Sequence, residues 1–278
     1  MATLNKIFSA IDESFTKENA GHYELAILAG EKYVSYSVFD TQQNFYLAVE
    51  SYRNTLSDLN EPGSMILLPY RNVRIIIENR RSTLVPAELF DPSEMKTYLS
   101  PTVDLTENDR YLNDRLLQPE IVTVYAIAES VAAELDALFP GRRTCHLSTV
   151  LMDTIWMCYK NQLHGTRMFI HIGEEDFSLL IFDKKNLVYN NSFHYQTPED
   201  LVYYVIFVME QLELNPEEIP LTLLGKIDRE TPLFELLFRY IRTIDFAMRN
   251  EAVGFSAVFN TIPAHYFFPL LNQGSCGS

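Results

Sequence analysis

The sequence predicts an α/β protein with two duplicated lobes, each opening with a three-stranded β-meander followed by alternating helices and strands. The first observation is internal similarity, because residues 25–52 align without gaps with residues 168–195 and eight of the 28 positions are identical. Average composition would give about two identities by chance. The identical pairs are Ile27/Ile170, Gly30/Gly173, Glu31/Glu174, Ser35/Ser178, Phe39/Phe182, Asp40/Asp183, Tyr46/Tyr189 and Tyr52/Tyr195. The second observation is the order of helix and strand patterns that follows each copy.

The second copy and the residues after it predict the order β-β-β-α-β-α-β. We expect the meander at about 167–195, a helix capped by Thr197 at 198–212, a strand at 219–224 ending at Gly225, and a helix at 231–240. Apolar residues recur at helical spacing in both helices, whereas the strands are short apolar runs bounded by turn residues.

The first copy predicts the same order with a larger insertion. Strands are expected at about 24–29, 33–39, 44–50, 64–69, 73–78, 121–128 and 144–147, and helices at 129–139 and 148–160. Residues 79–119 contain four prolines and many polar residues, so we expect an insertion there with a short helix near 92–99. The chain is therefore divided into a leader or short helix at 1–22, a first lobe at 23–160, a second lobe at 161–272 and a frayed tail at 273–278.

Charge and composition narrow the class of protein. The net charge is −15, with 37 acidic and 22 basic residues, so a polyanionic partner would be repelled and nucleic acid is not expected. The uninterrupted apolar stretch at 201–208 is far too short to span a membrane, also when Met209 is added to it. The three cysteines have no metal-ligand spacing, and the N-terminus lacks the pattern of a secretory signal. These features predict a cytoplasmic protein.

Two motifs resemble the actin-like ATPase superfamily, which includes actin, sugar kinases, heat-shock chaperone ATPases and bacterial pilus-assembly and cell-division ATPases. Ile170-His171-Ile172-Gly173 followed by 177–182 is similar to the hairpin with which those proteins hold phosphate. Leu223-Leu224-Gly225-Lys226 is similar to their glycine turn near adenosine. The whole chain is also similar to an uncharacterised Bacteroidetes family with an actin-like fold. The resemblance implies a duplicated, ribonuclease H-like fold and a site for ATP and Mg²⁺.

The phosphate motifs depart from that pattern in both copies. The superfamily places an Asp two residues before the glycine, where this chain has Leu28 and His171. Glu31-Lys32 and Glu174-Glu175-Asp176 replace the small residues that would cradle phosphate. Each pair of like charges at about 4 Å costs roughly 1 kcal/mol in water and about 4 kcal/mol near a protein surface. ATP with Mg²⁺ is therefore possible but disfavoured.

Five residues are candidates for binding a nucleotide, namely Gly30, Lys32, Gly173, Glu174 and Gly225, and no catalytic residue or metal ligand set is predicted. Four of them also have a plainer explanation. Gly30 and Gly173 suit tight turns that need positive φ, Lys32 suits an exposed turn, and the acidic run suits a solvated hairpin tip. The aromatic segment 266–268 is either core or a docking surface.

These observations favour a non-catalytic intracellular scaffold that binds a protein partner, and they specify neither the partner nor an oligomeric state. One alternative is an ATP-binding protein with an acidic Mg²⁺ site at Glu174–Asp176 and weak ATPase activity. A second alternative is a small-molecule kinase, which ranks last because no catalytic Asp is in register.

Overall fold

The computed structural model describes residues 4–116 and 120–272, which form two compact units. The first unit comprises Met1–Thr154, Glu251–Thr261 and Pro269–Ser278, and the second comprises Ile155–Asn250 and Ile262–Phe268. The predicted tail at 273–278 lies outside the described residues. Within the described part, none of the helices combines the length and the apolar character needed to cross a bilayer.

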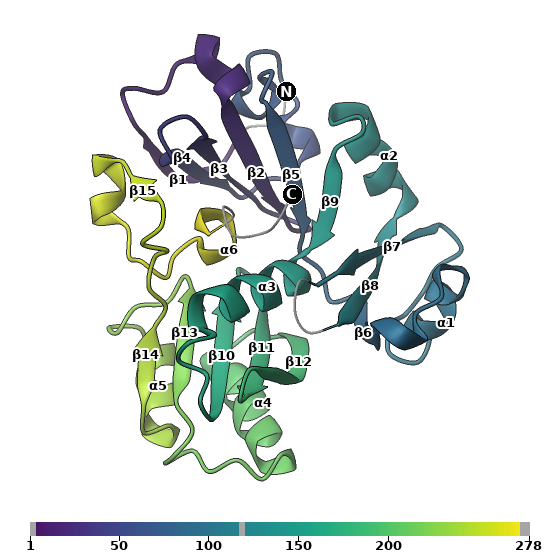
Figure 1. The fold of residues 1–278 in the computed structure, drawn as a ribbon, viewed down its shortest axis with the longest axis vertical. Coiled ribbons are helices and arrows are strands. Elements are labelled where there is room, and N and C mark those ends of the chain that lie inside the picture. Colours follow the sequence, from purple (N-terminus) through teal and green to yellow (C-terminus); the bar gives the residue numbers. More distant parts are fainter. Residues whose placement is uncertain (1–3, 117–119, 273–278) are drawn as a thin grey trace. The chain divides into compact units, whose positions relative to one another are not determined.

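The first unit is built on a seven-stranded sheet with the order β1-β4-β3-β2-β5-β9, in which β15 also pairs with β4 (Figure 1). Its strands are β1 (Lys6–Ile11), β2 (Tyr23–Ala29), β3 (Val34–Asp40), β4 (Phe45–Tyr52), β5 (Asn72–Ile77), β9 (Arg143–His146) and β15 (Gly254–Phe255). Strands β2, β3 and β4 are antiparallel and form the predicted meander, whereas β5 and β9 are added in parallel.

The second unit is built on a five-stranded sheet with the order β12-β11-β10-β13-β14. Its strands are β10 (Thr166–Ile172), β11 (Asp176–Asp183), β12 (Asn186–His194), β13 (Leu221–Gly225) and β14 (Ile244–Phe246). The predicted order β-β-β-α-β-α-β is confirmed, since α4 (Pro198–Gln211) and α5 (Pro232–Tyr240) separate the last three strands. Thr197 caps α4 in a complete capping box with Asp200, as its sequence predicts.

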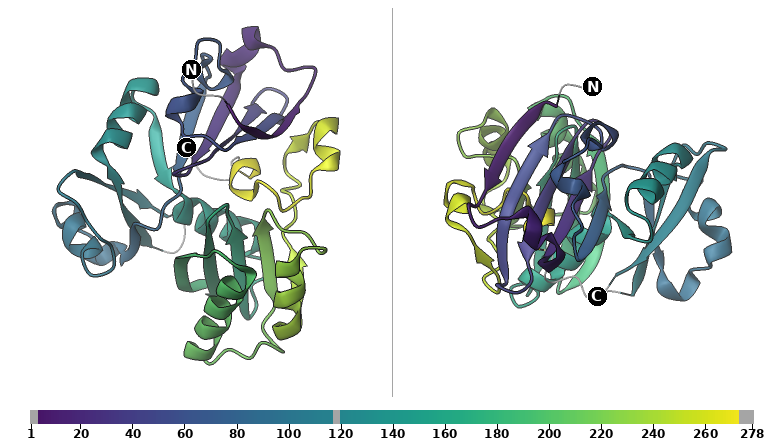
Figure 2. Two further views of the ribbon diagram at one scale, coloured as in Figure 1. Left: turned by 180° about the vertical axis from the view of Figure 1, so that it is seen from behind. Right: turned by 90° about the horizontal axis from the view of Figure 1, so that it is seen from above.

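The insertion forms a three-stranded sheet of its own, with the order β6-β8-β7 (Figure 2). Its strands are β6 (Ser82–Pro86), β7 (Asp109–Arg115) and β8 (Ile121–Ala128), and the predicted short helix is α1 (Met95–Leu99). The predicted end of the insertion at 119 was wrong, because β8 is the central strand of this separate sheet. Leu99 of α1 is fully buried in the small core of this sheet, together with Val122 and Val124. The insertion is therefore a folded element with its own core.

The remaining helices are short or flank the sheets. They are α2 (Glu129–Leu138), α3 (Leu147–Tyr159) and α6 (Phe268–Leu271), with 3₁₀ turns η1 (Lys17–His22), η2 (Ser57–Leu59), η3 (Met65–Leu67), η4 (Ala87–Leu89), η5 (Pro92–Glu94) and η6 (Ala257–Thr261). The strand predicted at 64–69 was wrong, because Met65–Leu67 forms the turn η3 between Ser64 and Leu68.

The first hairpins of the two sheets have the same register. Leu25 pairs with Val38 in one, and Met168 pairs with Ile181 in the other, which are equivalent positions in the ungapped alignment. The parallel neighbour is also equivalent, because β5 pairs with β2 as β13 pairs with β10. The five-strand order β4-β3-β2-β5-β9 thus matches β12-β11-β10-β13-β14.

The third strands are offset by two residues from the ungapped alignment. Val34 pairs with Tyr52, whereas the equivalent Phe177 pairs with Phe193. The cause is a shorter second turn, in which Lys184 and Lys185 both adopt positive φ, as a two-residue type I′ hairpin requires. The identities Tyr46/Tyr189 and Tyr52/Tyr195 are therefore not structurally equivalent.

Each sheet contains a pair of hydrogen-bonded serines, and the two pairs are equivalent once the two-residue offset of the third strands is applied. Ser35 Oγ donates to Ser51 Oγ at 2.8 Å, and Ser178 Oγ lies 2.9 Å from Ser192 Oγ. Both pairs join the second and third strands of a meander on directly opposed residues. The ungapped alignment matched the first serine of each pair and missed the second.

The predicted leader or short helix at 1–22 was wrong at Lys6–Ile11, which forms the edge strand β1, antiparallel to β4, whereas Lys17–His22 forms the short 3₁₀ turn η1. The chain also returns to the first sheet near its end, where Gly254 and Phe255 pair with Phe45 and Tyr46. Residues 251–261 therefore belong to the first unit, so their predicted place in a second lobe at 161–272 was wrong.

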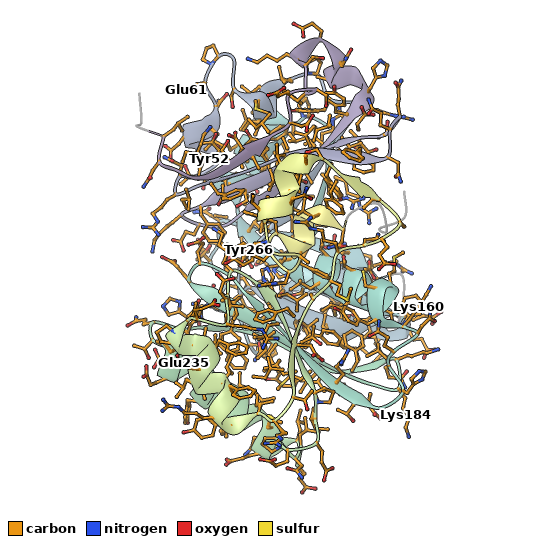
Figure 3. The ribbon with its side chains drawn as sticks, turned by 90° about the vertical axis from the view of Figure 1, so that its left-hand side faces the viewer. Tyr52, Glu61, Lys160, Lys184, Glu235 and Tyr266 are labelled. Atoms are coloured by element: carbon orange, nitrogen blue, oxygen red, sulfur yellow. The ribbon has the colours of Figure 1, made fainter. Side chains whose placement is uncertain are left out.

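A buried carboxylate holds β1 to the meander. Glu50 accepts hydrogen bonds from Lys6 Nζ at 2.6 Å, Ser9 Oγ at 2.5 Å and Tyr52 Oη at 2.7 Å, and also from Tyr36 Oη. Tyr52 is labelled in Figure 3. Burial by itself would raise the pKa of Glu50, but the donors together lower it below its ordinary value. The carboxylate is therefore ionised, and β1 supplies two of its four donors.

Replacing Glu50 by Gln should destabilise the first unit by about 1–3 kcal/mol at neutral pH, because the buried hydroxyls of Tyr36 and Tyr52 lose a charged acceptor and Lys6 loses its ion pair. A lowered pKa in the folded state adds stability above the unfolded value and loses it as pH falls through the folded value. The difference between wild type and variant in urea unfolding should therefore shrink below about pH 4.5. Glu13→Gln, at an exposed position, is the control; an equal loss there, or a difference independent of pH, would contradict the assignment.

Candidate functional site

The structure places the five candidate residues at three strand ends. Gly30 and Lys32 lie in the turn between β2 and β3 of the first unit, and Gly173 and Glu174 lie in the equivalent turn between β10 and β11 of the second unit. Gly225 ends β13, the parallel neighbour of β10. Gly173, Glu174 and Gly225 are thus brought together in the second unit, at the carboxyl ends of adjacent parallel strands, where α/β sheets commonly bind ligands.

Gly225 is required by the close approach of two backbones. Its φ is +90°, and a Cβ at this position would lie 2.1 Å from the carbonyl oxygen of Ile172. Its amide donates to His265 O at 2.9 Å, and the amide of Lys226 donates to Ile172 O at 3.4 Å. The turn is thereby fixed by its backbone hydrogen bonds, and glycine is the residue that fits its left-handed conformation.

The acidic turn is bonded to side chains of the same unit. Glu174 forms an ion pair with Lys226, and the Lys226 ammonium lies 5.8 Å from the centre of the Phe267 ring. Asp176 Oδ1 lies 3.0 Å from His194 Nδ1. Two of the three carboxylates in the turn are therefore directed at separate partners. Among the described residues no group of three or more His, Cys, Asp or Glu side chains is arranged to hold a metal ion.

The positions that would hold an acidic residue in an actin-like ATPase are buried and uncharged. His171 is 4% exposed, and its Nδ1 has no hydrogen-bond partner among the described residues. Burial lowers the pKa of His171 to about 4, so the imidazole is neutral at pH 7. Leu28 is also buried and offers an aliphatic side chain. Neither position can supply the negative charge that binds a metal ion.

The glycine of the first unit has a different role from the one predicted. Gly30 is outside the left-handed region, so its conformation does not require glycine. A Cβ there would lie 2.5 Å from the ring of Tyr33, whose carbonyl oxygen accepts the Gly30 amide at 2.9 Å. The aromatic ring therefore explains the small residue. Lys32 is exposed in the turn, as the plainer explanation predicted.

A cavity of about 490 Å³ lies at the same edge of the first sheet, and the sequence analysis did not predict it. Its walls include Gly30 and Glu31 after β2, Ile77 at the end of β5, and Val131 and Leu135 of α2. Most of the wall is apolar. The signal that could have revealed it is the meeting of two parallel strand ends beneath an amphipathic helix.

The aromatic segment near the C-terminus is core and not a docking surface. Phe267 and Phe268 are buried, and Tyr266, labelled in Figure 3, donates to Asp228 Oδ2 at 2.6 Å. His265 Nε2 lies 2.6 Å from the carbonyl oxygen of Ile227 and so donates to it. These contacts fold the segment against the loop after β13, which supports the turn at Gly225 from a second side.

The sheet order and the strand-end turns define an actin-like ATPase fold. A protein from Bacteroides thetaiotaomicron with an actin-like ATPase fold and unknown function is 21% identical, with a TM-score of 0.74 over 84% of this chain and 93% of that chain. The structure of a PilM–PilN type IV pilus biogenesis complex is 15% identical, with a TM-score of 0.62 over 92% and 99% of the two chains. Because both sequences are at most 21% identical to this chain, the similarity shows a common fold and no more.

The chain belongs to the DUF3822 family of proteins of unknown function, whose pattern matches residues 12–244. A search of curated proteins finds no relative that matches the sequence. The predicted resemblance to an actin-like family of unknown function and to pilus-assembly proteins is confirmed.

Gly225→Ala should destabilise the protein by at least about 2 kcal/mol, because a left-handed conformation is costly for alanine and the new methyl group would overlap a backbone oxygen. Chemical denaturation of the variant measures this loss. Gly165→Ala is the matched control, since a Cβ at Gly165 meets nothing within 4 Å and its φ is not left-handed. Equal stability of the two variants would show that the Ile172–Gly225 approach is not a constraint.

Proposed function

We propose that this chain is a non-catalytic intracellular scaffold that binds a protein partner and has lost the ATP chemistry associated with its fold. The observation that carries the proposal is the pair of buried, uncharged side chains, Leu28 and His171, at the positions of the metal-binding acid. Phosphoryl transfer depends on metal-held neutralisation of charge and on aligned donors. A neutral imidazole and an aliphatic side chain provide neither.

The turn in the second unit also disfavours a triphosphate. Lys226, whose ammonium could reach a phosphate, is paired with Glu174, so an incoming anion would compete with a carboxylate of the same turn. Glu175 and Asp176 add further negative charge beside it, and like charges repel phosphate at this distance. The ion pair therefore supports a site that does not recruit nucleotide.

The alternative, an ATP-binding protein with an acidic Mg²⁺ site, needs the carboxylates of Glu174, Glu175 and Asp176 to converge on one ion. Glu174 is bonded to Lys226 and Asp176 to His194, which lie on different elements. A metal ion would have to displace both Lys226 and His194 from these carboxylates. This arrangement favours the scaffold over the ATPase.

Partner binding is supported by analogy and by the equivalence of the two sheets. The structurally similar PilM is found in a complex with PilN. We propose that the present chain likewise acts by holding another protein. We also propose that the two matching sheets arose by internal duplication, which is supported by their common strand order and by the serine pairs in equivalent positions.

Titration with Mg-ATP and Mg-ADP in a thermal-unfolding assay should leave the melting temperature unchanged. A ligand present at 100 times its Kd would add about 2.7 kcal/mol of stability, which is several degrees for a chain of this size. The His171→Asp variant provides a comparison, because it introduces a carboxylate at one of the two positions, 28 and 171, where actin-like ATPases carry an acidic residue. A clear upward shift of the wild-type protein with either nucleotide would overturn the proposed function.

A further inference from the structure

An apolar groove of about 350 Å³ lies between α4 and α5 in the second unit. Val202, Tyr203, Ile206 and Phe207 of α4 form one wall, and Leu236 and Tyr240 of α5 form the other. The helices are neighbours on the same side of the five-stranded sheet (Figure 1), and Glu235, labelled in Figure 3, lies on the exposed side of α5. The groove is thus an external feature of the second unit.

The groove exposes more aromatic surface than folding of this unit requires. Tyr203, Phe207 and Tyr240 are 64%, 45% and 52% exposed. The rings of Tyr203 and Phe207 are stacked, with centroids 6.2 Å apart and planes at 19°. On the same helix, Leu201, Val205 and Val208 already bury the face that packs on the sheet. A second apolar face on a helix is typical of a surface that a partner covers.

The charges around the groove have one dominant sign. Glu199 and Glu210 line its two ends on α4, a helix that carries no Lys or Arg. The stretch 186–225 contains six acidic residues and no Lys or Arg. On α5, Glu235 and Arg239 lie outside the lining. The apolar floor is therefore bounded by carboxylates at both ends.

We propose that this groove binds an amphipathic helix of a partner protein that carries Lys or Arg at both ends of its apolar face. Eleven positions separate Glu199 from Glu210, which is about 16 Å along a helix. A bound helix that runs along the groove can place basic side chains about three turns apart, with apolar residues at positions i, i+3, i+4 and i+7 between them. The inference rests on the proposed scaffold function and names the class of partner.

A second copy of this chain fits the groove less well. A symmetric dimer would place the same face against itself, so its four carboxylates from Glu199 and Glu210 would gather at one interface. Like charges brought together at an interface oppose association. A basic helix instead pairs with these carboxylates and covers the aromatic rings at once.

The probe is a synthetic helical peptide of about 14 residues with leucines at i, i+3, i+4 and i+7 and lysines at both ends, compared with a twin in which Glu replaces every Lys. Fluorescence anisotropy with the full chain should show at least about tenfold tighter binding of the lysine peptide, which is 1.4 kcal/mol. Glu199→Lys with Glu210→Lys should remove this preference. Tyr203→Ala with Phe207→Ala should weaken binding of the lysine peptide about tenfold or more, as interface aromatics do.

Glu88→Lys with Glu107→Lys is the matched control, since it makes the same change in net charge at two exposed positions of the first unit. It should leave the preference intact. Equal binding of the two peptides, an equal loss in this control, or unchanged binding by the alanine variant would overturn the inference. So would a concentration-dependent dimer in sedimentation that Phe207→Asp dissociates, because the occupant would then be a second copy. The titration with Mg-ATP and Mg-ADP measures nucleotide binding and does not depend on the peptide. A failure of the proposed function can therefore be told apart from a failure of the proposed groove.

Discussion

The parallel pairing of β10 with β13 is the constraint on which the candidate site depends. It places Ile172 opposite Gly225, so the acidic turn after β10 and the Lys226 turn after β13 leave the sheet side by side. The closeness of the two backbones then requires glycine at 225, where a Cβ would lie 2.1 Å from Ile172 O. The ion pair between Glu174 and Lys226 follows from this geometry. The same pairing in the first unit, between β2 and β5, leaves a cavity beside Gly30.

Strand alternation explains why the core of the second unit does not depend on the residue at position 171. Along β10, Met168, Ile170 and Ile172 contribute to the core of the second unit, whereas His171 points to the opposite face of the sheet. A substitution at 171 therefore leaves these core contacts in place. Its cost is local, because a buried imidazole nitrogen has no hydrogen-bond partner among the described residues. The core of the second unit and the candidate site thus depend on different residues of the same strand.

Local patterns in the sequence predicted much of this architecture. They did not predict features that depend on contacts between residues far apart along the chain. Short apolar runs bounded by turn residues predicted the first hairpin of each sheet, and Thr197 predicted the start of α4. The edge strand β1 was missed because it depends on Glu50, which lies 44 positions from Lys6 along the chain. The two-residue offset was missed because it depends on the conformation of the Lys184–Lys185 turn. At the candidate site, Gly225 was predicted from its strand-end position, but the partner of Glu174 lies 52 positions away.

The distribution of cations bears on both proposals, the absence of ATP chemistry and the binding of a basic helix. Lys6, Arg81 and Lys226 are each paired with a carboxylate of the same unit, so basic side chains that could attract an anionic ligand already stabilise the fold. The chain as a whole keeps a net charge of −15, and its field attracts cationic groups over about one Debye length, near 8 Å at physiological salt. Such a field favours encounter with a basic partner and opposes encounter with a triphosphate. The apolar groove on the second unit then supplies the contact area that charge alone cannot provide, because exposed ion pairs contribute little stability whereas buried aromatic rings contribute much.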